Sequence, residues 1–464
     1  MTAQFSAEQI LEVTGGRLAQ GVLPDRVGAI SADTRQLSEG DWYLALPGER
    51  FDGHDFLGEA FSCGAIGCIV AERPSYPIAS TAFPLIAVGD TVAAYQHLAR
   101  SWRERIDPLV VAVTGSSGKT TTKEMTACVL AAGLKTYKSE ANYNNEIGVP
   151  KTILSMPEDT QALVLEMAMR GLGQIAVLAR TGLPDIGIIV NAGVAHLELL
   201  GSVENVIRAK CELLENMTGP QAVAIIGRPS EPLMTRVSQV FTGKTLSFDP
   251  DLLRELEVTP DCTVFELLDR SLAAGKVCRF QVSSHGISML QDAWCAIMAG
   301  REAGLDDQAI ARGLKEFRPV GGRGNRLAAG NGAVVVDEAY NANPDSVRAS
   351  VIAFDDARVF PQSRKFVVLG ELAELGEHTF RLHRELGIWL KERKLSGLIT
   401  VGKLARHIAD GAQGAGFEVL ACQDAGEAEA CLRERLTSDS CVLIKGSHSA
   451  NLDRLVSRLV STAN

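Results

Sequence analysis

The sequence predicts an α/β protein with three domains. Its 464 residues suffice for about three domains of ordinary size. An apolar run at 109–113 leads into a glycine-containing loop and then a helical pattern, which indicates a strand–loop–helix unit. Strands and helices alternate again from about residue 320. We therefore place the domains at residues 1–106, 107–320 and 321–464.

Composition excludes several classes of protein. The chain is 46% hydrophobic and 22% charged, a normal globular balance, and its net charge of -10 argues against a nucleic-acid-binding protein. A local basic pocket for a small anionic substrate is still compatible with that charge. The polar start of the chain has no signal-peptide core, and no run approaches the ~20 apolar residues of a membrane span. We expect a cytoplasmic protein that is not inserted in a membrane.

The ten cysteines contain no C-x-x-C pair, and most stand in apolar runs. Buried, reduced thiols explain this pattern better than zinc ligands or disulfides.

The first unit, residues 1–106, is expected to contain two short helices and several strands. Its polar clusters at 31–35 and 51–56 stand between apolar runs, so they belong on loops. Arg35 is a candidate phosphate ligand, and His54 is a candidate hydrogen-bond donor to a substrate. Ordinary turn chemistry also explains both clusters, and the residues taken alone favour it.

The loop after the strand at 109–113 has the chemistry of a phosphate-binding loop. Gly115 and Gly118 allow a sharp turn that points N–H groups at phosphate oxygens, and the following helix adds its positive N-terminal dipole. Lys119 can reach the β and γ phosphates, and the Thr120 hydroxyl can hold Mg²⁺. Val113 occupies a position where the usual pattern has glycine, so a tight turn with a chance lysine is the alternative.

Two later strands of this unit end in polar residues. The run 162–165 leads into Glu166, and the run 186–190 leads into a segment that ends at His196. Ligands of open parallel sheets lie outside the carboxyl ends of the strands, so both side chains are expected near Lys119 and Thr120. Glu166 suits Mg²⁺. A solvated strand end and a core or helix-capping histidine are the alternatives.

Three further segments complete the second unit. Three asparagines, a glycine and a proline predict a loop at 142–150. Residues 219–281 are expected to form strands and turns with little chemistry, and residues 292–299 a buried helix.

The third unit repeats the placement of polar clusters after apolar runs. The runs 333–336, 366–369 and 441–444 lead into polar segments at 337–346, 370–376 and 445–449. This unit therefore presents a second binding edge. Two such edges facing each other predict a cleft between domains, where small-molecule sites often lie.

The order of these motifs resembles that of the Mur ligase family of cell-wall enzymes over nearly the whole chain. The family's ATP loop, asparagine loop and Asn-Ala-Gly-x-x-His segment resemble 114–121, 142–150 and 191–196. Its C-terminal signatures resemble 337–346, 370–376 and 445–447, and its UDP-sugar loops resemble 33–35 and 52–54. Several motifs in one order are far more specific than the phosphate loop alone.

The resemblance implies a UDP-substrate-binding N-terminal domain, a central ATPase domain and a C-terminal Rossmann-like domain that binds the acceptor. It implies ATP and two Mg²⁺ ions as cofactors. It also implies that ATP phosphorylates a substrate carboxylate and that an amine attacks the acyl phosphate. The neighbouring family member, which forms the tripeptide, carries an Asp-Asn-Pro-Arg motif that binds the side chain of the diamino acid. This chain contains no Asn-Pro-Arg. The dipeptide-adding member is therefore favoured, with UDP-N-acetylmuramoyl-tripeptide and D-alanyl-D-alanine as substrates. We expect a monomer.

The same resemblance implies a role for individual residues. ATP would be bound by Gly115, Ser116, Ser117, Gly118, Lys119, Thr120, Thr121, Asp292, Arg323 and Asp337. Catalysis would involve Lys119, His196 and Lys210, and Mg²⁺ would be held by Thr120, Glu166, His196 and Lys210, the last after carbamylation by CO₂. The UDP-substrate would contact Ser31, Asp33, Thr34, Arg35, Asp52, Gly53, His54, Asn142 and Asn145. The acceptor would contact Tyr340, Asn341, Asn343 and Ser346.

Two segments depart from the family pattern. Glu371 stands where aspartate is usual. Ser288-Met289-Leu290-Gln291-Asp292-Ala293 stands where many members carry His-Asn-x-x-Asn-Ala, with asparagine near the adenine. Other functions also stay open: another ligase of this fold with a different amino acid or a folate-like acceptor, or a phosphate-loop kinase or nucleotide switch. The segment 33–35 is the feature that a plain kinase does not explain.

Overall fold

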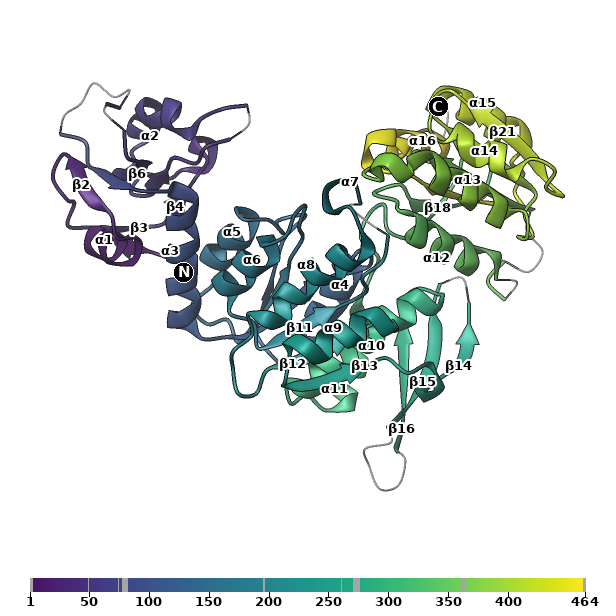
Figure 1. Ribbon diagram of the computed structural model, residues 1–464, viewed down its shortest axis with the longest axis horizontal. Coiled ribbons are helices and arrows are strands. Elements are labelled where there is room, and N and C mark those ends of the chain that lie inside the picture. Colours follow the sequence, from purple (N-terminus) through teal and green to yellow (C-terminus); the bar gives the residue numbers. More distant parts are fainter. Residues whose placement is uncertain are drawn as a thin grey trace.

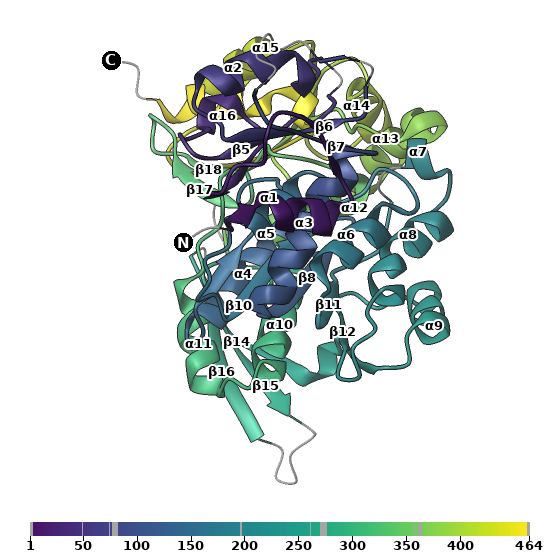
Figure 2. The ribbon, with the colours of Figure 1, turned by 90° about the vertical axis from the view of Figure 1, so that its left-hand side faces the viewer.

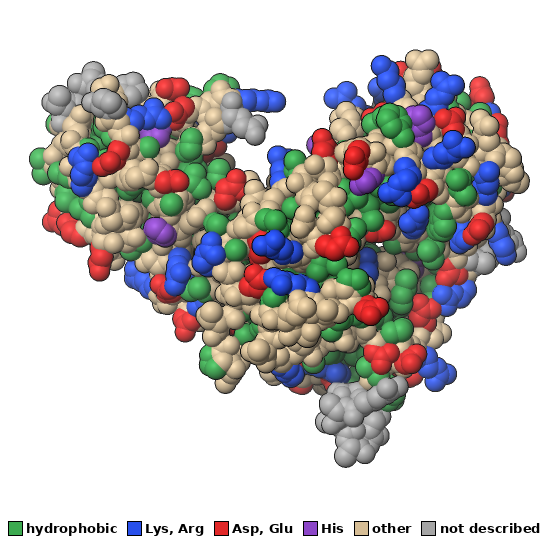
Figure 3. Space-filling view, in the orientation of Figure 1, with side chains coloured by type: hydrophobic (Ala, Val, Ile, Leu, Met, Phe, Trp, Pro, Cys, Tyr) green, Lys and Arg blue, Asp and Glu red, His purple; other side chains and the backbone are tan. Residues whose placement is uncertain are grey.

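The computed structural model describes residues 3–48, 50–73, 75–76, 82–194, 197–259, 261–269, 276–356, 358–360 and 364–461. It shows an α/β fold with three main sheets arranged as two upper lobes on a central body (Figure 1). The N-terminal sheet and the C-terminal sheet form the lobes, and the space-filling view is hollowed between them (Figure 3). None of the described helices is long and apolar enough to cross a membrane.

The N-terminal part contains a five-stranded sheet in the order β2-β7-β6-β5-β4. These strands are Arg17–Gln20, Leu85–Val88, Gly67–Ala71, Trp42–Leu44 and Ile30–Ser31, and only β2 runs antiparallel to its neighbour. A separate short pair joins β1, Phe5–Ser6, to β3, Val27–Gly28. The helices are α1, Ala7–Thr14; α2, Leu57–Ser62; and α3, Thr91–Ile106. We predicted two short helices here, but the described residues of this part form three, and α3 is 16 residues long.

The central part is a six-stranded parallel sheet in the order β13-β12-β11-β8-β10-β9. The strands are Lys244–Ser247, Val223–Ile226, Ile186–Ile189, Leu109–Thr114, Ala162–Glu166 and Thr136–Lys138. Its helices are α4, Lys119–Ala131; α5, Gly148–Ser155; α6, Gln174–Gly182; α7, Leu197–Leu200; α8, Val203–Glu215; α9, Glu231–Val240; α10, Ile287–Glu302; and α11, Asp307–Glu316. A three-stranded antiparallel sheet, β14-β15-β16, is attached to it: Leu253–Val258, Thr263–Asp269 and Lys276–Val282.

The alternation of buried residues along β8 explains the layers of the central part. Val110 and Ala112 pack in the core beneath α3, α5, α6 and α8, whereas Val111 and Val113 pack against α4, α10 and α11. Because successive side chains of a strand point to opposite faces, an all-apolar strand needs helices on both sides. Figure 2, turned by 90°, shows α3 and α5 near the viewer in front of this sheet.

The C-terminal part is a second six-stranded sheet, in the order β17-β18-β22-β19-β20-β21. Its strands are Asn325–Ala328, Val334–Glu338, Ser440–Lys445, Arg364–Gly370, Gly397–Val401 and Glu418–Cys422, and all but β17 are parallel. The helices are α12, Pro344–Asp355; α13, Thr379–Leu390; α14, Arg406–Ala412; α15, Ala425–Arg435; and α16, Leu452–Val460.

The six apolar runs predicted as strands lie in β8, β10, β11, β18, β19 and β22, which confirms those predictions. Two predictions need correction. The segment 142–150 is not a loop throughout, because α5 begins at Gly148. There the Asn145 side chain accepts from the N–H groups of Ile147 and Gly148, and Pro150 falls in the first turn, where proline is tolerated. The segment 219–281 also contains a helix, α9, with proline in its first turn.

Candidate active site

The phosphate loop connects β8 to α4 at the carboxyl edge of the central sheet. Gly118 ends the loop with a φ of 78°, and a Cβ there would lie 3.0 Å from Cγ1 of Val190. Glycine is therefore needed both for the left-handed backbone and for the close approach. The Lys119 ammonium donates to the Gly115 carbonyl oxygen at 2.7 Å, so its side chain folds back over the loop. The arrangement is an anion site at a helix N-terminus.

Asn191 holds this loop in shape. Its side-chain oxygen accepts from the N–H groups of Ser116 and Ser117, both at 3.0 Å, and its amide donates to the Ser117 carbonyl oxygen at 3.1 Å. Asn191 follows directly after β11 and Val190, at the strand end where the sequence analysis placed polar chemistry. We did not single it out as a site residue, although its position offered that signal.

Oxygen ligands for a cation converge beside the loop. The Thr120 hydroxyl lies 2.8 Å from Oε2 of Glu166, and the side-chain amide of Asn144 donates to Oε1 of Glu166 at 2.8 Å. Glu166 is 3% exposed, and the Lys123 ammonium lies 3.9 Å from its Oε2. A hydroxyl and a buried, oriented carboxylate are the kind of ligands that Mg²⁺ prefers. Asn144 is a further residue that we had not assigned to the site.

Lys210 lies on α8 and is 2% exposed. Burial lowers its pKa well below the usual value, and repulsion from Lys119 adds to this effect. Burial also lowers the pKa of Lys119 itself, with the Glu166 carboxylate opposing that shift. His196, the other predicted metal ligand and catalytic residue, lies outside the residues that the structure describes.

The central and C-terminal parts meet at a cleft of about 770 Å³. Its central side includes the phosphate loop, Glu166 and Asp292, and its C-terminal side includes Arg323 and Lys445. The Lys445 ammonium pairs with Glu338 at 2.9 Å at the end of β18. The predicted cleft between two binding edges is therefore present.

The predicted ATP ligands of the C-terminal part occupy its edge. The Arg323 guanidinium stacks over the Tyr340 ring at 4.1 Å and lines the cleft. Asp337 accepts from the N–H groups of Gly322 and Ala339, at 3.2 and 3.1 Å, and burial raises its pKa. Asp337 is not among the described residues that line the cleft, and its carboxylate serves the turn that holds Gly322.

The predicted acceptor residues line the cleft, but some of their polar groups already form hydrogen bonds within the C-terminal part. Tyr340, Asn341, Asn343 and Ser346 are all among its lining residues. Asn343 caps α12: its side-chain oxygen accepts from the Ser346 N–H at 2.8 Å, and the Ser346 hydroxyl accepts from the Asn343 N–H at 3.0 Å. The Asn343 side-chain amide also donates to the Ser116 carbonyl oxygen at 3.3 Å. Asn343 therefore joins the C-terminal part to the phosphate loop.

The predicted UDP-substrate residues of the N-terminal part lie on two short turns away from this cleft. Ser31 ends β4, and its hydroxyl donates to the Asp33 carbonyl oxygen at 3.0 Å; in the turn that follows, Arg35 pairs with Asp33 at 2.8 Å and is largely exposed. Asp52 and Gly53 begin the second turn. Asn142 and Asn145, predicted for the same substrate, do line the cleft.

The role predicted for His54 as a donor to substrate is not supported by its geometry. The ring is 1% exposed. Nδ1 lies 2.6 Å from the Asp52 carboxylate, and Nε2 accepts from the Ala71 N–H at 2.8 Å. Both ring nitrogens are thus used inside the fold, so His54 fixes the turn rather than reaching solvent.

Sequence reasoning also missed Arg228, which follows β12. Its side chain reaches Ser117 and Asp292 at the edge of the phosphate loop. The sequence signal was a charged residue after an apolar run, but we had predicted that the segment 219–281 contains few residues with a chemical role.

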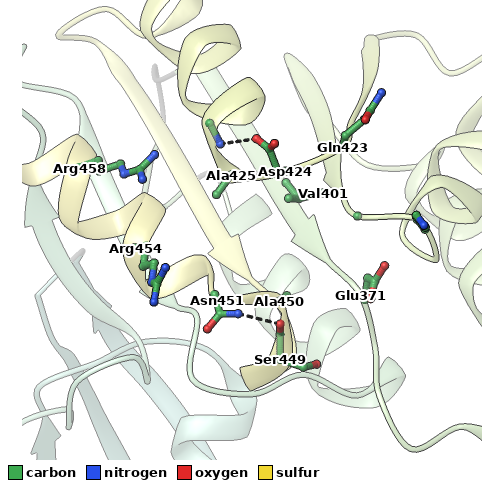
Figure 4. Close-up of a pocket in the computed structure, with 13 residues that line it drawn as sticks. Glu371, Val401, Gln423, Asp424, Ala425, Ser449, Ala450, Asn451, Arg454 and Arg458 are labelled. Atoms are coloured by element: carbon green, nitrogen blue, oxygen red, sulfur yellow. Dashed lines mark hydrogen bonds between the residues drawn. The ribbon is translucent and has the colours of Figure 1, made fainter.

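A second cavity, of about 610 Å³, lies at the carboxyl ends of β20 and β21. Arg454 and Arg458 on α16, Asp424 at the start of α15 and Glu371 line it (Figure 4). None of the predicted site residues is among the described residues around it.

Comparison with known proteins identifies the family of the chain. The chain matches the Mur ligase middle domain over residues 113–299 and the Mur ligase, glutamate ligase domain over residues 322–448. It is 37% identical to UDP-N-acetylmuramoyl-tripeptide–D-alanyl-D-alanine ligase from Synechocystis, covering 94% of this chain and 92% of that protein. The Bacillus subtilis ligase of the same name is 31% identical, with 98% of each chain covered.

Solved structures agree with the sequence matches. A crystal structure of MurF from Acinetobacter baumannii superposes with a TM-score of 0.89 at 28% identity, covering 99% of both chains. MurF ligase from Thermotoga maritima in complex with ADP superposes with a TM-score of 0.82 at 29% identity, covering 94% of this chain and 97% of that one.

Proposed function

The chain belongs to the Mur ligase family, and from this membership we propose that it is an ATP-dependent ligase that adds D-alanyl-D-alanine to UDP-N-acetylmuramoyl-tripeptide. Relatives named for this reaction align with nearly its full length. The product is an amide bond, and the reaction is the last peptide-adding step of peptidoglycan precursor synthesis in the cytoplasm.

One observation carries the proposal: the phosphate loop and the binding edge of the C-terminal part line the same cleft. A carboxylate is a poor electrophile, so the ligase first converts it to an acyl phosphate. This step brings a carboxylate and a triphosphate together, and their repulsion must be offset. Lys119 from the central part and Arg323 from the C-terminal part supply positive charge on the two sides of the cleft.

The residues of the loop have distinct tasks in this scheme. Lys119 leaves the Gly115 carbonyl oxygen and binds the transferred phosphoryl group. Thr120 and Glu166 fit Mg²⁺, and Asn144 orients the Glu166 carboxylate toward it. Bound Mg²⁺ supplies further charge neutralisation for the phosphates. His196 is proposed as a ligand of a second Mg²⁺.

Lys210 is proposed to act as a carbamate. Carbamylation by CO₂ needs a neutral amine, and the lowered pKa of Lys210 increases the neutral fraction. The modified side chain would be an anionic oxygen ligand, which would suit a site that contains the Lys119 cation and residues that fit Mg²⁺.

The substrates are assigned to the two lobes. We propose that the first domain, residues 1–106, binds the UDP-substrate through Asp33, Arg35 and Asp52. The tripeptide then crosses the hollow between the lobes, past Asn142 and Asn145, to the phosphate loop (Figure 3). The domain 107–320 binds ATP, and the domain 321–464 binds D-alanyl-D-alanine near Tyr340 and Asn341.

The proposal is tested by phosphate release with purified protein, ATP, Mg²⁺ and UDP-N-acetylmuramoyl-tripeptide. D-alanyl-D-alanine should start sustained release, and a diamino acid in its place should not. Release that is independent of both substrates indicates a nucleotide switch, and release that prefers the diamino acid indicates a different ligase of this fold.

A further inference from the structure

Arg228 and Asp292 form an ion pair at the mouth of the phosphate loop. Arg228 follows β12, next to β11 in the central sheet, and Asp292 lies on α10. Nη2 of Arg228 lies 3.5 Å from Oδ1 of Asp292. The side chains are 23% and 5% exposed, so the pair is largely removed from water. Both residues line the cleft.

Further hydrogen bonds hold the Arg228 guanidinium in place. Nε donates to Oε1 of Gln291 at 2.7 Å, and Nη2 donates to the Ser288 carbonyl oxygen at 3.3 Å. Nη1 donates to the Ser117 hydroxyl at 3.4 Å. Arg228 therefore connects the first two turns of α10 to the phosphate loop.

Asp292 itself lies against that loop. A Cβ on Gly118 would be 3.0 Å from Oδ1 of Asp292. An ionised carboxylate so close to the loop repels a phosphate chain bound there, unless a cation offsets it. Burial raises the pKa of Asp292 to about 7, and Arg228 opposes this rise. The Thr122 hydroxyl on α4 also lowers the pKa of this carboxyl, and the Cys295 thiol on α10 lies close enough to interact with it.

We propose that Arg228 is a positioning residue for the nucleotide, which fixes Ser117 in the phosphate loop and offsets the charge of Asp292. The inference rests on the proposed ATP site and adds a residue to it. The ligand class is a nucleoside diphosphate or triphosphate. Arg228 acts through Asp292, so its importance depends on whether that carboxyl is ionised.

The test compares ADP binding by R228M and by R228M/D292N, using the full chain with Mg²⁺ and calorimetry at pH 6.0 and 8.5. The wild type at both pH values corrects for ionisation of ADP. R301M is the control, because Arg301 lies on the same helix as Asp292 and pairs with Asp307 of α11 at 2.9 Å, away from the phosphate loop, and its side chain is 20% exposed.

R228M should bind ADP about tenfold more weakly than the wild type at pH 8.5, because it loses both the Ser117 contact and the cation beside Asp292. The defect should be smaller at pH 6.0, where a larger fraction of the Asp292 carboxyl is protonated. R228M/D292N should recover most of the affinity that R228M loses at pH 8.5, and R301M should bind normally. A double variant as weak as R228M, an R228M defect larger at pH 6.0 than at pH 8.5, or an equal defect in R301M overturns the proposal.

Two further measurements keep the test decisive. If R228M does not fold, D292N alone is informative: tighter ADP binding than the wild type at pH 8.5 supports the inference, and weaker binding overturns it. A failure of the proposed function itself would give a different result. The wild type would then not bind ADP, or K119A would bind ADP as well as the wild type does.

Discussion

Lys119 is the residue on which the proposed phosphoryl transfer most depends. It is the cation of the phosphate loop, and its ammonium is held at the loop by the Gly115 carbonyl oxygen. K119A should lower kcat by about 10² or more, as expected when a preorganised charge is removed. Steady-state phosphate release with both substrates measures this. K135A, at an exposed lysine paired with Asp159, is the control and should be unaffected. Near-native turnover by K119A contradicts the phosphate-loop assignment.

Lys210 gives a second prediction for a single residue. K210A should lose most activity, because it removes the proposed carbamate ligand. Acetate should restore part of the activity by placing a carboxylate in the vacated space. The measurement is the ligation rate over a series of acetate concentrations, with chloride salts as the ionic-strength control. Full activity of K210A without acetate rules out a needed carbamate.

A site residue could be predicted when the sequence pattern that marks it lies next to it in the chain. Glu166 ends an apolar strand, and Lys119 and Thr120 follow the glycine loop after another, so the sequence pattern alone placed them at one edge. Arg228 also follows a strand, but its partner Asp292 lies 64 residues later, and only the fold brings the two together. His54 shows the opposite error: an isolated histidine on a predicted loop was assigned to substrate, whereas tertiary packing buried it.

At the scale of elements, the turn from β8 to α4 requires glycine at position 118. G118A forces alanine into a left-handed backbone at a cost of about 1–2 kcal/mol and places a methyl group 3.0 Å from Val190 and Asp292. It should lower both the stability and the affinity for ADP. Gly201 also has a positive φ but nothing within 4 Å of its Cβ position, so G201A is the control. Equal ADP affinity in G118A and G201A contradicts the steric argument.

The predictions of helices and strands were correct where one spacing of apolar residues dominated a segment. The parallel strands were recognisable as short apolar runs, since both of their faces are buried. Helix α5 was missed at its start because Asn145, which accepts from the Gly148 N–H, and the first-turn Pro150 are residue types that are also common in loops. The packing of α10 beside α4 depends on contacts between residues far apart in the sequence, which no local pattern encodes.

At the scale of the whole molecule, the C-terminal part touches the central part through ion pairs and ring contacts as well as hydrogen bonds. Asp345 accepts from the Val194 N–H at 2.8 Å, and Asn343 donates to Ser116 at 3.3 Å. Such contacts are compatible with a hinge, which we predict at residues 318–324, where Gly322 and Gly324 have positive φ.

An ATP analogue should draw the two parts together, because it binds residues of both and a reactive acyl phosphate needs protection from water. Small-angle scattering should show a smaller radius of gyration with the analogue than without it. K119A, which should bind it poorly, serves as the control. Identical wild-type profiles in the two conditions contradict closure.

The central claim is that the chain activates a carboxylate by phosphorylation, and oxygen transfer tests it most directly. UDP-N-acetylmuramoyl-tripeptide is labelled with ¹⁸O in its terminal carboxylate and incubated with ATP and D-alanyl-D-alanine in ordinary water. The oxygen that links carbon to phosphorus in the acyl phosphate leaves with the phosphate when the amine attacks. Mass spectrometry should therefore find one ¹⁸O in each phosphate released. Phosphate without ¹⁸O, or label in AMP, would contradict the account.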